Sequence, residues 1–344
     1  MIYLNSSNSV ILKTLGVPII NDFNHLAEQL SLSTGLLYFL TYQKKYCYTR
    51  KEIPKKDGTT RILYIPRLDL KVVQRWILKE ILEKINVSQQ AMAFVPKING
   101  LKRNAEYHKN NIFILQMDLK NFFDSIREDR IFHLFCNIGY NKDVSAILTN
   151  LCTYNKKLPQ GAVTSPYLAN LSTYHLDARL SGLCSRKDIV YTRYADDLCF
   201  SSNDRTKLNR IEKFVRYIIK DEGLNLNKRK TRYLSNDVKK TVTGITINNE
   251  EIHADKHFKR KIRAMIFNSI MNQNNLENEK IRGSIAFVNS IEPGFKNKMV
   301  DYIKMLTDKP HLKNNKDIVL YFNQNKIYKS LPDMEYEEYM FPFD

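Results

Sequence analysis

The sequence lacks long apolar runs and has few cysteines. No apolar run in its 344 residues reaches the roughly 18 residues of a membrane-spanning helix, so we expect no membrane association. The opening residues, MIYLNSSNSV, lack the basic region of a secretory signal. The cysteines are scattered, odd in number and not spaced as in a zinc site: Cys47, Cys136, Cys152, Cys184 and Cys199. This usage is typical of the reducing cytoplasm, where thiols stay free, and we expect a cytoplasmic protein.

Acidic residues are scarce beside basic ones. The chain has 54 Lys and Arg residues against 36 Asp and Glu residues, which gives a formal net charge of +18. Such an excess favours a polyanionic partner, with nucleic acid first, although a general solubility charge is the alternative. Hydrophobic residues make up 43% of the chain, which argues against disorder. The length suffices for one large domain or two to three small ones.

The apolar pattern predicts helices and strands that mix without a regular βαβ alternation. Short helices flank a basic segment, YTRKEIPKKDGTTRILYIP, whose Lys-Asp-Gly-Thr turn predicts a two-stranded hairpin. The apolar run IFILQMDL predicts a buried strand that ends in Asp118, and residues 189–201 predict two strands around a tight turn. Helices are expected over about 126–137, from Ser165 past His175, over 206–222, and throughout the chain after about residue 249. This mixture indicates the α+β class.

Three aspartates stand where an unpaired charge is unfavourable. Asp118 ends a buried strand, and Asp196 and Asp197 share a tight turn in which adjacent carboxylates repel each other. Divalent cations would relieve both arrangements. Two Mg²⁺ ions held by carboxylates can activate an attacking hydroxyl and stabilise a leaving pyrophosphate. Taken singly, each aspartate is explained as well by a solvated turn or a helix cap, and the three alone define no reaction.

Two further segments carry groups suited to a nucleotide. LPQGAVTSP places Gly161, which frees the backbone, before a helix start, so this loop can lie against a base pair or a sugar. The basic hairpin offers Lys55, Lys56 and Arg61 to a triphosphate, and arginine can bind phosphate through two hydrogen bonds. The run NLNKRKTRY adds more positive charge. As isolated features, such basic runs are more often solvated surface.

Together these segments resemble a reverse transcriptase. YADD at Tyr194–Asp197 resembles the family's Tyr-x-Asp-Asp turn, and MDLKNFFDSI resembles the block that carries the first catalytic aspartate, here Asp118. LPQGAVTSPYLANL resembles the Gln-Gly block that lines the nucleotide pocket. IPKKDGTTRILYIP resembles the finger hairpin that grips the triphosphate, and GLNLNKRKT resembles a later block that contains Lys230. The five blocks follow the family's order and cover about residues 50–248.

A narrower resemblance is to the retron reverse transcriptases. NAEYH at Asn104–His108 is similar to their Asn-Ala-x-x-His signature, and Val242–Gly244 is similar to their second signature, Val-Thr-Gly. A surface helix turn and an ordinary strand are the alternative interpretations of these short motifs. Both motifs stand at the expected places in a chain of retron size, so the chain is identified as a retron-type reverse transcriptase.

The resemblance implies a right-hand polymerase built of fingers, palm and thumb. Residues 1–109 would form N-terminal helices and fingers, and residues 110–248 the catalytic palm, an antiparallel sheet with helices, together with some finger elements. Residues 249–330 would form a helical thumb that binds RNA. The remaining residues, 331–344, form an acidic and aromatic tail with no Lys or Arg from Asp333 onward.

The resemblance also implies roles for individual residues. Asp118, Asp196 and Asp197 would be catalytic and would hold two Mg²⁺ ions, for which Mn²⁺ can substitute. The residues expected to bind the nucleotide are Lys55, Lys56, Arg61, Phe122, Phe123, Gln160, Gly161 and Lys230. Phe123 would be the steric gate against a ribose 2′-hydroxyl, with an ordinary core aromatic as the alternative. The residues expected to contact RNA are Asn104, His108, Val242, Thr243, Gly244, Lys256, Lys259, Arg260, Lys261 and Arg263.

The implied substrates are dNTPs and a structured noncoding RNA. That RNA would be template and, through the 2′-hydroxyl of a guanosine, primer, and the product would be a branched multicopy RNA–DNA hybrid, msDNA. The family further implies an effector protein encoded nearby and a role in anti-phage defence. The alternatives are another bacterial reverse transcriptase (group II intron-like, diversity-generating or defence-associated) and a non-enzymatic RNA-binding scaffold that holds an effector. An adjacent structured RNA gene discriminates the first, and the presence of all three aspartates argues against the second.

Overall fold

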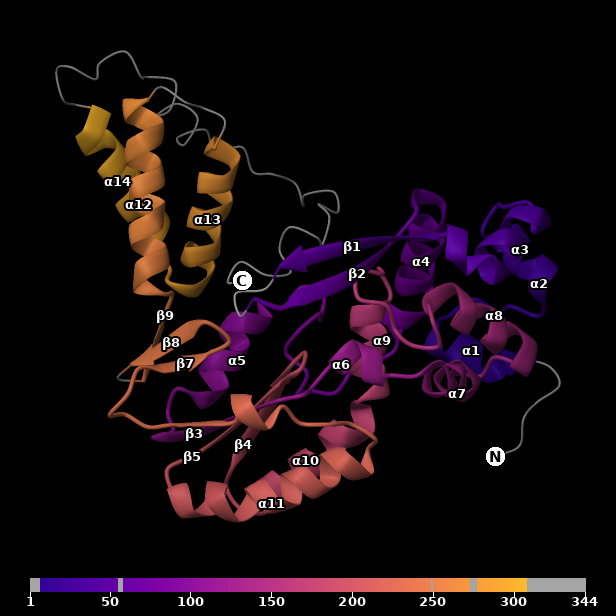
Figure 1. Cartoon of the computed structure of the whole chain (residues 1–344), viewed down its shortest axis with the longest axis horizontal. Coiled ribbons are helices and arrows are strands. Elements are labelled where there is room, and N and C mark those ends of the chain that lie inside the picture. The colour runs from indigo at the N-terminus through magenta and orange to yellow at the C-terminus, as the bar shows by residue number, and fades with distance from the viewer. Residues whose placement is uncertain (1–6, 55–57, 249, 273–276, 308–344) are drawn as a thin grey trace. The chain divides into compact units, whose positions relative to one another are not determined.

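The computed structural model describes residues 7–54, 58–248, 250–272 and 277–307. The chain forms two compact units (Figure 1). Among the described residues, the first comprises those up to Ile98 together with Leu115–Tyr233, and the second comprises Asn99–Ile114 and those from Leu234 to Thr307. In the part of the chain that the structure describes, no helix has the length and apolar character needed to cross a bilayer.

The first unit opens with short helices whose ends follow from their capping residues. Asn8, Asp22 and Ser33 each accept a hydrogen bond from a backbone N–H of the first turn that follows, which is the usual way to begin a helix. The helical elements of this region are α1 (Ser9–Leu15), α2 (Phe23–Gln29), α3 (Thr34–Tyr42), η1 (Lys44–Tyr46), α4 (Leu68–Glu80) and η2 (Leu82–Lys84).

The predicted basic hairpin is confirmed. Strand β1 (Tyr48–Pro54) pairs antiparallel with β2 (Thr60–Pro66), from Tyr48 opposite Pro66 to Pro54 opposite Thr60. The connecting turn carries Lys55 and Lys56, which lie outside the described residues. The roles expected for these two lysines therefore stay predictions.

A four-stranded sheet forms the centre of the first unit. Its strand order is β4-β5-β3-β6, and its strands are β3 (Phe113–Asp118), β4 (Val190–Tyr194), β5 (Asp197–Ser202) and β6 (Arg232–Leu234). The apolar side chains of the two central strands are buried, among them Leu115, Leu198 and Phe200. Helices α10 (Tyr174–Ser185) and α11 (Arg205–Asp221) pack against β4 and β5 and against each other (Figure 1).

The helix predicted from Ser165 past His175 is two helices in the structure. Helix α9 (Ser165–Ser172) ends before Thr173, and α10 begins at Tyr174. The hydroxyl of Thr173 donates to the Ala169 carbonyl at 2.8 Å, a contact that competes with the helical ladder and bends helices. The remaining helices of this unit are α6 (Phe122–Ser125), α7 (Glu128–Ile138), α8 (Lys142–Cys152) and η3 (Lys228–Lys230).

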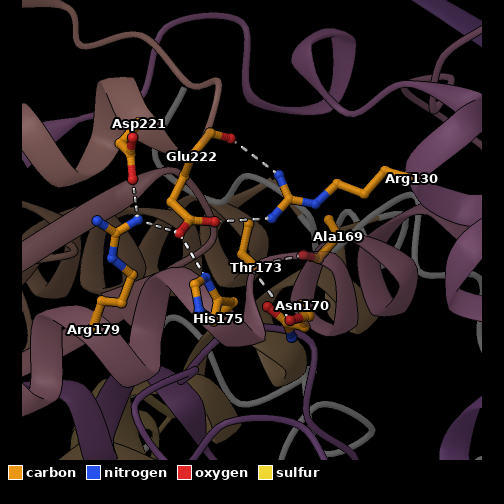
Figure 2. A network of polar contacts seen from close by, with 8 residues as sticks. All are labelled: Arg130, Ala169, Asn170, Thr173, His175, Arg179, Asp221 and Glu222. Carbon is orange, nitrogen blue, oxygen red and sulfur yellow. Dashed lines mark hydrogen bonds and ion pairs between the residues drawn. The ribbon is translucent and has the colours of Figure 1, made fainter. Parts of the chain in front are cut away.

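A buried glutamate joins three helices of the first unit (Figure 2). Glu222 follows α11, and its carboxylate accepts hydrogen bonds from His175 and Arg179 of α10, each at 2.7 Å, and from Arg130 of α7 at 3.4 Å. Burial raises the pKa of Glu222, but these hydrogen bonds outweigh burial and hold it below its ordinary value. The network fixes the point at which the chain leaves α11 and turns toward Lys230.

The second unit combines a small sheet with helices. Strands β7, β8 and β9 form an antiparallel sheet against which α5 packs, and α12, α13 and α14 pack on one another (Figure 1). The elements are α5 (Gly100–His108), β7 (Lys240–Val242), β8 (Ile245–Asn248), β9 (Glu251–His253), α12 (Lys256–Met271), α13 (Asn278–Ile291) and α14 (Phe295–Thr307).

The expectation of an all-helical chain after about residue 249 is wrong for β9. This strand has three residues, too few to show a periodicity, and it forms because Ile252 pairs with Ile247 of β8. Pro293 and Gly294 separate α13 from α14. The acidic tail at 331–344 lies outside the described residues.

Candidate active site

The sheet places a two-residue hairpin loop at the end of β4 and β5. Tyr194 pairs with Asp197, so Ala195 and Asp196 form the loop. Ala195 has φ +55°, in the left-handed region, at a position where two-residue hairpins favour glycine. The loop therefore holds a strained residue next to Asp196.

Backbone hydrogen bonds fasten Asp118 to this loop. The N–H of Leu119 donates to the Asp196 carbonyl at 2.9 Å, and the N–H of Asn227 donates to the Asp118 carbonyl at 2.8 Å. Strand β3 lies between β5 and β6 in the sheet. Segments 78 residues apart in the sequence (196 − 118) are thus held side by side, as a shared cation site requires.

The three carboxylates interact strongly. Burial, and then the charge of Asp118, raises the pKa of Asp196, while Lys230 and Arg61 partly offset this. Limited hydration, and then the charges of Asp196 and Asp118, raises the pKa of Asp197 to about 7, although its side chain reaches solvent. The Lys230 ammonium lies 2.9 Å from Asp118 Oδ2. Burial lowers the pKa of Lys230, but this contact outweighs burial and raises it.

The expected nucleotide pocket has a tight backbone contact at the Gln-Gly block. The N–H of Tyr64 on β2 donates to the Gln160 carbonyl at 2.7 Å. Gly161 has φ +108°, and a Cβ at that position would lie 3.1 Å from the Tyr64 carbonyl oxygen. Only glycine fits both the conformation and the space, so this residue joins the finger hairpin to the block.

Two phenylalanines follow the strand that carries Asp118. The Phe122 ring is buried, whereas Phe123 is only partly so. The Phe123 ring centroid lies 5.5 Å from that of Phe122 and 6.3 Å from that of Phe94. A partly exposed ring beside the aspartate strand fits the expected gate position better than a core position.

The sequence did not single out Arg193, a buried arginine on β4. Arg193 and Asp177 are both fully buried, and the Arg193 Nη2 and Asp177 Oδ2 atoms are 2.7 Å apart. Arg193 also donates to the Asn170 side chain at 3.1 Å and to the Ala195 carbonyl at 3.2 Å. The available signal was a charged residue within the apolar strand IVYTRY. No sequence pattern identifies its partner Asp177, which lies 16 residues earlier.

The two short signatures of the second unit meet in the structure. The Asn104 side chain of α5 donates to the Thr243 hydroxyl at 3.3 Å, and Thr243 and Gly244 both have positive φ. The side chains of Asn104, His108 and Val242 are buried, and burial lowers the pKa of His108 to about 3. These buried groups shape the α5–sheet unit, and their expected part in RNA binding stays a prediction.

The basic residues of α12 divide into two kinds. Lys256, Arg260, Lys261 and Arg263 are exposed. Lys259 is half-buried, and its ammonium lies 2.8 Å from Glu292 Oε1. Its charge is therefore already compensated within the protein.

Comparison with known proteins agrees with this geometry. Residues 53–273 match the family model described as reverse transcriptase (RNA-dependent DNA polymerase). The chain belongs to the reverse transcriptase family. Retron Ec86 reverse transcriptase of Escherichia coli is 33% identical to it over 304 residues, which cover 88% of this chain and 94% of that protein. Retron Mx65 reverse transcriptase of Myxococcus xanthus is 31% identical over 301 residues, which cover 81% and 70%.

By its similarity to these relatives, the chain is a retron-type reverse transcriptase and an RNA-directed DNA polymerase. Among solved structures it is similar to telomerase from Candida albicans in complex with a fragment of telomeric RNA, with a TM-score of 0.50 and 12% identity. That match covers 80% of this chain and 55% of the telomerase chain. The expected right-hand polymerase fold of the α+β class is confirmed.

Reverse transcriptases act on RNA and DNA and depend on divalent metal ions. The aspartate cluster of this reverse transcriptase fits such ions, because its donors are carboxylate oxygens and their mutual repulsion is what a hard cation relieves. In the residues that the structure describes, no three His, Cys, Asp or Glu side chains are already arranged as a metal site. Asp118 pairs with Lys230 instead.

We expect D197N to raise the midpoint of thermal unfolding of the metal-free enzyme near pH 8 and to abolish DNA synthesis. The folded-state pKa of about 7 exceeds the ordinary 3.8, so ionised Asp197 destabilises the fold fully above pH 7. As the pH falls from 7 toward 4, the wild-type carboxyl gains a proton in the folded state and the difference closes. Solvent screening limits the gain to about 1 kcal/mol.

Calorimetry near pH 8 and near pH 5, without metal, measures the effect. D188N removes a carboxylate whose side chain is 90% exposed and is the matched control, with no midpoint change expected at either pH. A D197N midpoint below that of the wild type near pH 8 would contradict a raised pKa of Asp197 in the folded state.

Proposed function

We propose that this chain is a retron reverse transcriptase that copies a structured noncoding RNA into a branched RNA–DNA hybrid. The observation that carries the proposal is the backbone attachment of Asp118 to the Asp196–Asp197 loop, in a chain related to retron enzymes over most of its length. Synthesis would begin on the 2′-hydroxyl of a guanosine in the RNA. A phosphodiester bond forms between that oxygen and the α-phosphate of a dNTP, and pyrophosphate leaves.

The aspartates, the basic groups and the pocket residues have separate roles in this reaction. Two Mg²⁺ ions held by Asp118 and Asp196, with Asp197 as ligand or close neighbour, would neutralise the attacking and leaving oxygens. Lys230 and Arg61, whose charges already act on the aspartates, bind the triphosphate. The glycine in the Gln-Gly block lets backbone approach the nucleotide, and Phe123 excludes a ribose 2′-hydroxyl.

The RNA partner is recognised by shape and backbone charge rather than by a groove code. The exposed cations of α12 supply that charge. The buried residues Asn104, His108 and Val242, with Thr243 and Gly244, act indirectly by holding the surface of the α5–sheet unit in shape. We further infer a cytoplasmic complex with an effector protein encoded nearby, acting in anti-phage defence. The basis for this last inference is the relationship to retron enzymes.

Purification of the chain from its native host, followed by sequencing of the bound nucleic acid, tests the proposal. We expect one structured RNA joined through a 2′–5′ branch to a short DNA, and a stoichiometric second protein in mass spectrometry. The D196N/D197N variant should retain the RNA and lose the DNA, because the cation ligands are removed. Recovery of intron RNA, or of unbranched cDNA, would assign the chain to another class of reverse transcriptase.

We expect F123A to accept ribonucleotides. Loss of the ring opens the space that a 2′-hydroxyl needs, so the ratio of kcat/KM for a dNTP to that for the matching rNTP should fall about tenfold or more. Single-nucleotide extension of an annealed primer measures the ratio. F123Y keeps the ring and is the control. An unchanged ratio in F123A would make Phe123 an ordinary packing residue.

We expect R260Q/K261Q/R263Q to weaken RNA binding and to flatten its salt dependence. For each RNA phosphate that the variant no longer neutralises, the slope of log affinity against log salt should decrease by about 0.7. Titration of the cognate RNA at several salt concentrations gives the slope. The charge-conserving variant R260K/K261R/R263K is the matched control and should keep it. Equal slopes for both variants would place the RNA elsewhere.

A further inference from the structure

Arg193 reaches three elements from a single buried position on β4. Its Nε and Nη2 donate to Asp177 of α10, at 2.8 and 2.7 Å. Its Nη1 donates to the Asn170 side chain of α9 and to the Ala195 carbonyl. The planar guanidinium is the side chain that can present donors in all these directions at once.

The bond to Ala195 falls where the catalytic hairpin is strained. Ala195 keeps φ +55° although it has a Cβ, and alanine seldom adopts this conformation without support. The carbonyl of Ala195 accepts from Arg193 at 3.2 Å, only two residues along the chain. The next residue is Asp196, whose own carbonyl accepts from Leu119. The loop that carries the aspartates is thus held from both sides.

The same guanidinium contacts a buried aromatic ring. Its central carbon lies 5.9 Å from the centroid of the Phe122 ring, which neighbours Phe123. Asn170, which orients Nη1, is itself fixed by donating to the Ala93 carbonyl at 2.7 Å. Arg193 therefore links the aspartate loop to the aromatic pair through groups that are themselves held.

Stability alone does not account for this arrangement. A fully buried ion pair contributes little net stability compared with apolar side chains of the same volume, because both charges lose their hydration. Asp177 is already satisfied by Arg193 and by the Tyr191 hydroxyl at 2.8 Å. The additional contacts to Ala195 and Phe122 are what distinguish Arg193 from an ordinary core pair.

We propose that Arg193 is a positioning residue that sets the aspartate loop relative to Phe122 and thereby the cation affinity of the site. This inference rests on the proposed catalytic role of Asp118, Asp196 and Asp197. Arg193 is fully buried, so it would affect nucleotide and cation only through the groups that it contacts. It acts through the Ala195 carbonyl.

The test compares R193K with the wild type in two measurements. In R193K a point charge can still pair with Asp177, but the fork that reaches Ala195 is absent. Mn²⁺ should raise the midpoint of thermal unfolding of the wild type, because an ion that binds the folded state stabilises it. In R193K the Mn²⁺ concentration needed for an equal rise should increase about tenfold, and kcat should fall about tenfold.

Y191F is the matched control. It removes a buried hydrogen bond to the same Asp177 and leaves the Ala195 contact intact, so it should lower the midpoint without moving the Mn²⁺ dependence. If R193K does not fold, N170A replaces it, because Asn170 orients Nη1 while the Arg193–Asp177 pair stays. N170A should shift the Mn²⁺ dependence in the same direction by a smaller factor.

Rescue by glycine provides the second test. Glycine adopts φ +55° without strain, so R193K/A195G should recover part of the decrease in Mn²⁺ affinity and kcat that R193K causes. An R193K enzyme with wild-type Mn²⁺ dependence and kcat overturns the inference, as does a double variant with no recovery. If Mn²⁺ does not change the unfolding midpoint of the wild type, the aspartate cation site itself is overturned. This outcome is distinct from one that overturns only the role of Arg193.

Discussion

Repulsion among three carboxylates at one end of a sheet is the constraint on which the first unit depends. Burial, and then the charges of Asp196 and Asp118, raise the pKa of Asp197 to about 7, so in the absence of cations the cluster opposes folding at neutral pH. Backbone hydrogen bonds hold the segments that carry these carboxylates together. The N–H of Leu119 donates to the Asp196 carbonyl, and the N–H of Asn227 donates to the Asp118 carbonyl. Lys230 then neutralises Asp118 directly.

Stabilising contacts elsewhere in the unit offset this local instability. The Glu222 carboxylate binds Arg130, His175 and Arg179 and so fixes the end of α11. The segment that follows contains Lys230, whose ammonium donates to Asp118. The strain at Ala195 and the charge at Asp197 both reduce stability, and both lie in the loop that we propose to be catalytic. Local rules of folding are broken where function requires it, and well-satisfied networks nearby compensate.

Features that depend on one short segment could be predicted from the sequence, whereas contacts between residues far apart in the chain could not. The Lys-Asp-Gly-Thr turn predicts the hairpin, and the glycine of the Gln-Gly block predicts a close backbone approach. Both could be predicted because each requirement concerns one short segment. The partnership of Arg193 with Asp177 and the capture of Lys259 by Glu292 depend on packing between helices and strands. Charge composition alone made Lys259 look equivalent to its exposed neighbours.

Sheet order explains why the two retron signatures meet although they lie 139 residues apart. Strands β3 and β6 are neighbours in the four-stranded sheet. The segment that precedes β3 includes α5 with Asn104, and the segment that follows β6 includes β7 and Thr243. Adjacent strands bring both segments to one place, where they form a single packed unit.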